Sequence, residues 1–69
     1  MPERLDNRLK DLRGELGLTQ ALLAEAVGVT RKTINTVENG VFVPSALLAL
    51  KIARALGRPV EQIFSISGD

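Results

Sequence analysis

Four side-chain types are absent from this sequence of 69 residues: cysteine, histidine, tryptophan and tyrosine. Without cysteine no disulfide can form, and without cysteine and histidine the usual zinc-site patterns are missing. Cysteine, histidine and tyrosine are also among the side chains that enzymes use most as nucleophiles and general bases. One carboxylate pair, Asp11 and Glu15, shares a helix face, but this spacing is typical of a solvated surface. We therefore expect a protein that is not an enzyme, with no catalytic residues, no metal and no cofactor.

Long hydrophobic runs are missing as well. No apolar segment approaches the ~20 residues that a membrane-spanning helix needs, and residues 1–13, MPERLDNRLKDLR, are charged throughout, unlike a targeting signal. The sequence thus predicts a cytoplasmic protein with no membrane partner. A strong charge of one sign is also lacking, because nine basic and eight acidic residues leave a formal net charge of +1. A nucleic-acid partner must therefore be inferred from where the charges lie.

Aromatic side chains are limited to Phe42 and Phe64. A core must then be built from leucine, isoleucine, valine and alanine, which favours packed helices. The length allows one domain, residues 1–69, because a second core would not fit. A core of this size supplies only roughly 3–5 kcal/mol, so in the absence of a disulfide we expect oligomerisation to add stability.

Five helices are predicted from apolar spacing and from capping residues. They are an amphipathic helix around Leu5, Leu9, Leu12 and Leu16, followed by helices over residues 20–27, 31–39, 46–56 and 60–64. Thr19, Thr30 and Ser45 stand where a hydroxyl can cap a helix N-terminus. Because short loops join the helices, we expect an all-α bundle.

Two of these helices are short and nearly contiguous. Gly28 ends the helix over residues 20–27, since glycine adopts a left-handed backbone at little cost, and only a valine and a threonine separate it from the next. The apolar face of this helix is expected to comprise Leu22, Leu23, Ala26 and Val27. The following helix has only Ile34, Val37 and part of Thr33 as an apolar stripe, so its polar remainder faces outward. Such a pair forms a helix-turn-helix, whose second helix can enter a DNA major groove.

Residues 20–39 resemble the helix-turn-helix of the phage-repressor, Cro and Xre family of DNA-binding proteins. The resemblance rests on Gln20 opening the first motif helix, Ala24 at the helix crossing, Gly28 at the turn, inward-facing Leu23, Val27, Val29, Ile34 and Val37, and the sequence ENG at residues 38–40. The flanking segments agree, so it covers about residues 5–65. It implies a five-helix, lambda-repressor-like domain with the motif at helices two and three, and double-stranded DNA as the partner.

The resemblance places the DNA contacts on the two motif helices. The residues implied are Thr19, Gln20, Thr30, Arg31, Lys32, Thr33, Asn35 and Thr36. Arginine and lysine can donate to guanine O6 and N7, asparagine can pair with adenine, and a threonine methyl can contact the thymine methyl. The N-terminus of the first motif helix offers backbone N–H groups to a phosphate, with Gln20 either supporting that contact or reaching the second helix. The alternative for these exposed side chains is a solvated helix face.

An ion pair is also implied by the resemblance. Arg13 and Glu38 stand where related repressors pair an arginine of the first helix with a glutamate at the end of the recognition helix, and the pair would orient that helix. The alternative is two unrelated surface charges.

The loop after ENG departs from the family pattern. Val41, Phe42 and Val43 stand where many relatives carry side chains that touch phosphates. Phosphate contacts must then come from basic side chains near or within the motif, namely Arg8, Lys10, Arg13, Arg31 and Lys32. We expect Phe42 to pack into the core and Val41 or Val43 to remain exposed.

Residues 60–69 are predicted to be a dimerisation tail. Their apolar side chains exceed what so small a core can cover, and they are Val60, Ile63, Phe64 and Ile66. A two-fold dimer would present two recognition helices ~34 Å apart to a palindromic operator. Ordinary core packing is the alternative, above all for Ile63.

Together these features predict a sequence-specific DNA-binding transcriptional regulator that acts as a homodimer. A repressor is the default by analogy with the family, because no activation surface is evident. The main alternative is a protein-interaction module, such as an antitoxin or a coactivator-type adaptor, whose principal partner is another protein.

Overall fold

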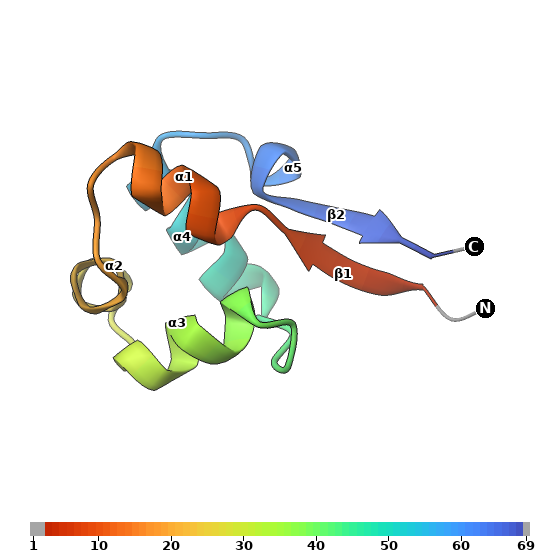
Figure 1. Cartoon of the computed structure of the whole chain (residues 1–69), viewed down its shortest axis with the longest axis horizontal. Coiled ribbons are helices and arrows are strands. Elements are labelled where there is room, and N and C mark those ends of the chain that lie inside the picture. Colours follow the sequence, from red (N-terminus) through yellow and green to blue (C-terminus); the bar gives the residue numbers. More distant parts are fainter. Residues whose placement is uncertain (1–2, 69) are drawn as a thin grey trace.

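Five helices pack together, and a two-stranded sheet extends from one side of them (Figure 1). The structure is a computed structural model and describes residues 3–68. In chain order the elements are β1 (Arg4–Asn7), α1 (Leu9–Glu15), α2 (Gln20–Val27), α3 (Arg31–Glu38), α4 (Ala46–Leu56), α5 (Val60–Ile63) and β2 (Phe64–Ser67). The predicted five-helix fold is therefore confirmed. Within residues 3–68, none of the helices has both the length and the apolar character needed to cross a membrane.

The core lies between the helices and is built from aliphatic side chains. Every helix contributes, and the fully buried residues are Leu9, Leu12, Leu23, Ile34, Val37, Ile52 and Ile63. Burying one such side chain stabilises the fold by roughly 1.5–3 kcal/mol. Because no cysteine is available for a cross-link, this cluster is the main source of stability in the described part of the chain.

The helix ends follow from local sequence. The hydroxyls of Thr19, Thr30 and Ser45 each accept a hydrogen bond from the backbone N–H three residues later, at 3.0, 3.2 and 3.1 Å. These contacts satisfy a donor that would otherwise be unpaired at the start of α2, α3 and α4. Gly28 ends α2 with φ at 78°, a left-handed conformation that glycine adopts without steric cost. The predicted limits of α2 and α4 are confirmed, and α3 ends one residue earlier than predicted.

The sheet was not predicted from the sequence. Leu5 was assigned to the first helix, but it lies in β1, which pairs antiparallel with β2 so that Leu5 stands opposite Ile66 and Asn7 opposite Phe64. Local spacing favoured a helix, whereas the partner strand is about 60 residues away in the chain. A hydrogen bond of 2.8 Å from the Arg8 N–H to the Ile63 carbonyl continues the pairing toward α5.

Some expectations about burial were also wrong. On α2, Leu22 and Ala26 are exposed, whereas Ala24, Leu23 and Val27 are buried. Leu16, predicted to lie on the apolar face of the first helix, follows the last residue of α1 and is about half exposed.

The α3–α4 loop differs from the prediction in one residue. Phe42 does not enter the core and is 47% exposed; its N–H donates to the Thr36 carbonyl at 3.2 Å, which holds the residue beside Lys32 and Thr33. Val41 and Val43, of which at least one was expected on the surface, are both exposed.

Candidate nucleic-acid interface

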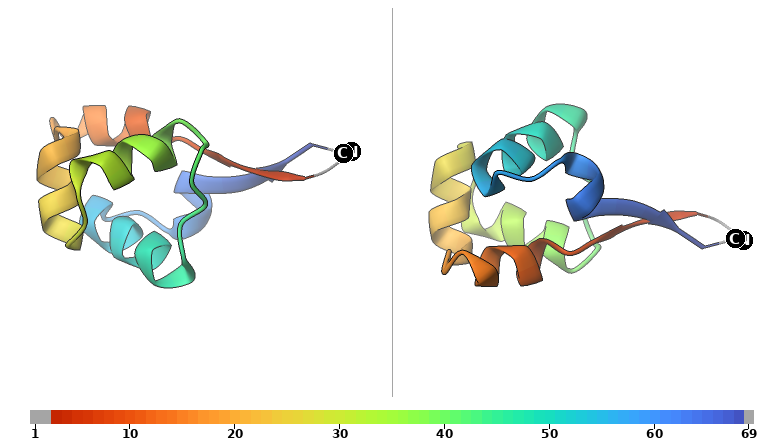
Figure 2. Two further views of the ribbon diagram at one scale, coloured as in Figure 1. Left: turned by 90° about the horizontal axis from the view of Figure 1, so that it is seen from below. Right: turned by 90° about the horizontal axis from the view of Figure 1, so that it is seen from above.

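Helix α3 presents one polar edge to the outside. Ile34 and Val37 are buried and fix its inner face, while Arg31, Lys32 and Asn35 are exposed. Seen from below, α3 lies at the front of the molecule and packs beside α2 (Figure 2, left). The helix is therefore anchored on one side and open on the other, as insertion into a groove requires.

The threonines of α3 have part of their hydrogen bonding used within the protein. Thr36 Oγ1 donates to the Thr33 carbonyl at 2.9 Å, and the Thr33 hydroxyl lies 3.0 Å from that of Thr30. Both Thr33 and Thr36 are half-buried. With its hydroxyl proton committed, Thr36 has its methyl group and its oxygen lone pairs to offer a base.

Asn35 has a neighbour that the sequence analysis missed. Asn39 Nδ2 donates to Asn35 Oδ1 at 3.2 Å, between exposed side chains one turn apart. This contact orients the Asn35 amide and leaves its NH₂ group free to donate, with one lone pair left on Oδ1. The signal was available, because amides at positions i and i+4 of an exposed helix face can pair.

The two polar side chains at the start of α2, Thr19 and Gln20, have different hydrogen-bond partners. Thr19 caps the helix through the Leu22 N–H. Gln20 does not point outward: its Nε2 donates to Glu38 Oε1 at 3.1 Å and so reaches α3. The groups left for a phosphate at this position are the free backbone N–H groups of the first turn.

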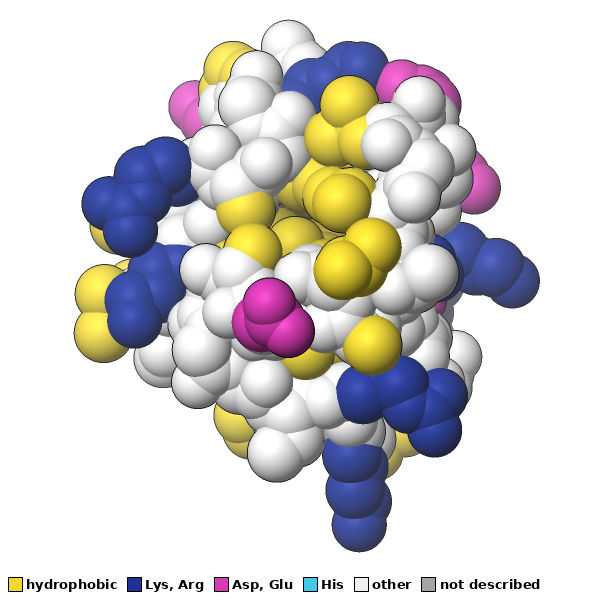
Figure 3. All heavy atoms as spheres, turned by 90° about the vertical axis from the view of Figure 1, so that its left-hand side faces the viewer, with side chains coloured by type: hydrophobic (Ala, Val, Ile, Leu, Met, Phe, Trp, Pro, Cys, Tyr) yellow, Lys and Arg dark blue, Asp and Glu magenta, His cyan; other side chains and the backbone are white. Residues whose placement is uncertain are grey.

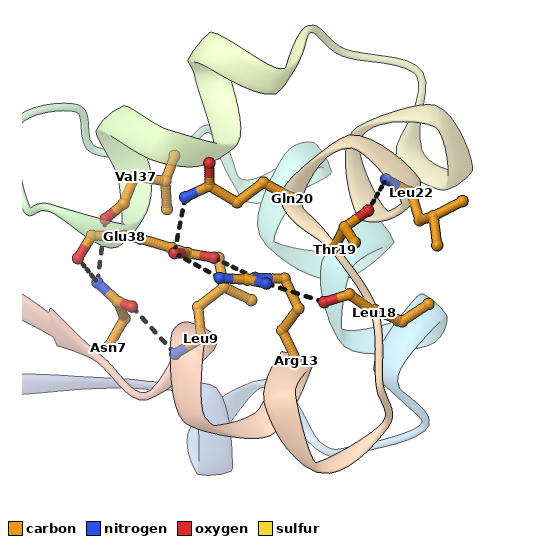
Figure 4. A network of polar contacts seen from close by, with 9 residues as sticks. All are labelled: Asn7, Leu9, Arg13, Leu18, Thr19, Gln20, Leu22, Val37 and Glu38. Carbon is orange, nitrogen blue, oxygen red and sulfur yellow. Dashed lines mark hydrogen bonds and ion pairs between the residues drawn. The ribbon is translucent and has the colours of Figure 1, made fainter.

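Glu38 is the centre of a polar network that joins three helices (Figure 4). Arg13 Nε donates to Glu38 Oε2 at 2.7 Å and Arg13 Nη2 to Oε1 at 3.2 Å, a bidentate pair between α1 and α3. Arg13 Nη1 also donates to the Leu18 carbonyl at 2.8 Å, ahead of α2. The side chains of Arg13 and Glu38 are only 15% and 4% exposed. The hydrogen bonds to Glu38 raise the pKa of Arg13 above its ordinary value, although burial acts in the opposite direction.

Asn7 holds the other side of the same helix end, and it too was missed. Its Nδ2 donates to the Val37 carbonyl at 3.0 Å, and its Oδ1 accepts from the Leu9 N–H at 3.0 Å (Figure 4). One side chain thus satisfies a carbonyl in the last turn of α3 and an N–H in the first turn of α1. No sequence pattern links residues 30 positions apart, so only the fold could reveal this contact.

Of the five basic side chains expected near DNA, four are exposed to solvent and one is engaged in hydrogen bonds within the protein. Arg8, Lys10, Arg31 and Lys32 are exposed. Arg13 is not available to a phosphate, because its guanidinium is engaged by Glu38 and Leu18. In the part of the chain that the structure describes, no group of three or more metal-ligating side chains is arranged to hold a metal ion.

The residues expected at a dimer interface occupy different environments. Ile63 and Phe64 are 1% and 9% exposed and belong to the monomer core, so the expectation that they form a surface was wrong. Ile63 is the last residue of α5 and Phe64 the first of β2, and both belong to the buried cluster that the helices share. Val60 is half-buried against the core, and Ile66 on β2 is exposed.

Comparison with known proteins supports one family. The sequence model of the family described as helix-turn-helix matches residues 9–63. An uncharacterized HTH-type transcriptional regulator of Methanothermobacter thermautotrophicus is 55% identical over 62 residues, which cover 88% of this chain and 90% of that protein. The uncharacterized HTH-type transcriptional regulator YgzD of Bacillus subtilis is 47% identical over 60 residues, covering 87% and 91%. Among solved structures, the restriction-modification controller protein C.AhdI of Aeromonas hydrophila superposes with a TM-score of 0.76 at 36% identity, over 80% of this chain and 83% of that one.

Proposed function

The chain belongs to the helix-turn-helix family of Xre- and Cro-like proteins, and we propose that it is a sequence-specific DNA-binding regulator of transcription. In this proposal a homodimer binds a palindromic operator with one α3 in each major groove, and residues 1–69 act as a single domain in the cytoplasm. The observation that supports it most is the anchoring of α3. Ile34 and Val37 fix its inner face, Glu38 ties its end to two other helices, and its polar edge stays open.

The exposed side chains of α3 match the chemistry of base edges. Arg31 and Lys32 can donate to guanine O6 and N7, and Asn35 can pair with adenine N6 and N7. The Asn35–Asn39 contact fixes the amide before DNA arrives, which lowers the entropy cost of that pairing. The methyl of Thr36 can contact a thymine methyl.

Phosphate contacts would come from the N-termini of both motif helices. The first turn of α2 offers backbone N–H groups beside Thr19, and Thr30 caps α3 next to Arg31 and Lys32. The α3–α4 loop adds little, because Val41 and Phe42 line a shallow hollow beside Lys32, Thr33 and Thr36 instead of a basic patch. Each subunit therefore makes few phosphate contacts, and useful affinity depends on two subunits binding together.

Repression by occlusion of a promoter is the simplest mode of action for a DNA-binding domain of this size. A dimer that covers an operator overlapping a promoter excludes the transcription machinery without any activating contact. This part of the proposal rests on analogy with the family.

Selection of bound sequences from a random DNA pool tests the proposal. We expect enrichment of a palindrome whose half-sites lie one helical turn apart, about 34–36 Å. The reading role of α3 is then tested with Arg31→Ala against Arg54→Ala, which removes the same charge from the exposed face of α4. Enrichment of no sequence, or equal loss of affinity in both variants, would contradict the proposal.

The alternative is a protein-interaction module, and one observation favours it. The face that carries α2 has hydrophobic side chains in its middle, with basic and acidic side chains around them (Figure 3). Leu22 on α2 and Leu16 after α1 are each about half exposed. An antitoxin or adaptor would bind its protein partner through such a surface. Capture of a protein partner that is abolished by Leu22→Glu, together with no DNA enrichment, would favour this alternative.

A further inference from the structure

A shallow hollow lies on one flank of α3, beside the exposed polar edge of that helix. It is lined by side chains of α3 and of the α3–α4 loop, namely Lys32, Thr33, Thr36, Val41 and Phe42. Its volume is about 340 Å³, which leaves room for a small group that protrudes from a base edge. Val41 is 77% exposed and Phe42 is 47% exposed. Large apolar side chains that gather at an exposed hollow mark an interaction site more than a solvated surface.

The loop wall of this hollow is held against α3 by backbone contacts. Gly40 has a φ of 74°, a left-handed conformation that turns the chain back toward α3. The N–H groups of Val41 and Phe42 then both donate to the Thr36 carbonyl, at 3.0 and 3.2 Å. The positions of the two residues are therefore fixed relative to α3 before a ligand arrives, which lowers the entropy cost of binding.

The helix wall of the hollow is largely apolar although it contains two threonines. Thr36 Oγ1 donates to the Thr33 carbonyl at 2.9 Å, and the Thr33 hydroxyl lies 3.0 Å from the Thr30 hydroxyl. Because both hydroxyls have partners within the protein, the methyl groups of Thr33 and Thr36 are the parts left for a ligand. Lys32 supplies the charge, and its ammonium can stay in water while its carbon chain covers apolar surface. The hollow thus suits a small apolar group beside a hydrogen-bond acceptor.

The DNA major groove offers such a combination. The C5-methyl of thymine is an apolar group that projects into the groove, and O6 and N7 of guanine are acceptors in the same groove. Cytosine methylated at C5 carries the same group at the same ring position. A lysine that donates to guanine while the neighbouring hollow encloses a methyl group would read two adjacent base pairs together.

We propose that the hollow between α3 and the α3–α4 loop receives the C5-methyl of a pyrimidine, next to the base pair that Lys32 contacts. The inference rests on the proposed function and adds two specificity-determining residues to it, Val41 and Phe42. Residues 41–45 carry no charge to offer a phosphate. The loop contributes base discrimination in place of phosphate contacts.

Methyl scanning of the enriched operator tests this proposal. In both half-sites each thymine is replaced in turn by deoxyuridine, which lacks only the C5-methyl, and each cytosine by 5-methylcytosine. Dissociation constants are measured by fluorescence titration. At one position we expect the methyl to strengthen binding by about fourfold per half-site, the fold-change for one buried methyl group. Because the contact is uncharged, this ratio should stay constant as the salt concentration changes, unlike contacts to phosphates.

Base-pair substitution at that position identifies the source of the methyl. Pairs of thymine with adenine and of 5-methylcytosine with guanine carry the methyl group, whereas the corresponding uracil and cytosine pairs lack it. Tighter binding of the thymine pair than of the methylated cytosine pair assigns the contact to thymine, and the reverse order assigns it to methylated cytosine.

Variants of the loop assign the effect to the hollow. Phe42→Ala and Val41→Ser should each bring the ratio of the methylated to the unmethylated operator close to one. Val43→Ser is the matched control, because Val43 lies in the same loop, is 67% exposed and lines a different hollow. It should keep the wild-type ratio. Melting curves check that the variants fold, and Val41→Ser alters a side chain that lies outside the core.

The possible outcomes separate this inference from the proposed function. An enriched operator whose affinity no C5-methyl changes would overturn the inference and leave the proposed function standing. A methyl effect that persists in both Phe42→Ala and Val41→Ser would do the same. Enrichment of no sequence would refute the proposed function, and the methyl contact with it.

Discussion

Replacing Glu38 with alanine tests the network that joins α1, α2 and α3. The substitution removes the acceptor of two hydrogen bonds from Arg13 and one from Gln20. Arg13 keeps its contact with the Leu18 carbonyl, but its guanidinium is left without a counter-ion where only 15% of the side chain reaches water. A buried charge without a partner is the most costly consequence of breaking such a pair.

The size of the effect can be estimated from burial. Breaking a buried ion pair by removing one partner costs about 3–5 kcal/mol, and the partial exposure of Arg13 places Glu38→Ala near the lower end of that range. The free energy of unfolding of a 69-residue domain is only about 3–10 kcal/mol in total. At ~4–8 °C per kcal/mol for a domain of this size, the melting temperature should fall by at least ~12 °C.

A double-mutant cycle separates the pair from its surroundings. Glu38→Ala, Arg13→Ala and both together are compared by urea denaturation, and the coupling between the two sites should exceed ~0.5 kcal/mol. Arg13→Met combined with Glu38→Leu leaves no buried charge and should regain part of the lost stability. If the pair also orients α3, this double variant should still bind the operator about tenfold more weakly than the wild type, which is ~1.4 kcal/mol.

Two results would refute this reasoning. A melting temperature of Glu38→Ala within a few degrees of the wild type would show that the carboxylate contributes little to the fold. Operator affinity restored in full by the apolar double variant would show that the pair stabilises the domain without orienting α3.

Other substitutions and conditions test the remaining features. Gly28→Ala should destabilise the domain by about 1–2 kcal/mol because its φ is positive, whereas Gly14→Ala, in α1 with open space around it, should stabilise by about 0.5–1 kcal/mol. Equal effects in urea denaturation would contradict this. Thr30→Ala removes the cap of α3 and should cost ~1 kcal/mol, and an unchanged denaturation midpoint would contradict it. Arg31→Ala should weaken operator binding by about 1–3 kcal/mol in a fluorescence titration, with Arg54→Ala unaffected. The logarithm of dimer affinity against that of salt concentration should have a slope of about −4 to −7, from two to four phosphates per subunit. A slope near zero would exclude DNA binding through phosphates.

The helices and the exposed polar edge of α3 could be predicted from the sequence because their determinants are local. Thr19 and Thr30 cap helices by accepting hydrogen bonds from backbone N–H groups three residues away. Gly28 ends α2 in a left-handed conformation that glycine adopts because it has no side chain. The apolar stripe of Ile34 and Val37 is likewise set by the 3.6-residue period of a single helix. Each of these interactions lies within one turn of the chain, so no knowledge of the fold is needed to find it.

The Arg13–Glu38 contact was predicted only from the resemblance to a family. In sequence 25 residues separate the two, and no spacing rule joins them. The environment of Phe42 could not be predicted either, because it depends on how much space the other side chains leave between the helices.

Only the tertiary structure revealed how distant segments meet. The pairing of β1 with β2, the contact of Asn7 with the end of α3, and the convergence of Val43 and Ile66 on one groove all join residues far apart in the chain. Such contacts depend on the aliphatic core that holds the helices together, because closing a long loop carries an entropy cost that local interactions cannot offset. The sequence by itself thus determined which helix presents a polar edge, and the packing decided how that helix is held and which distant segments lie beside its end.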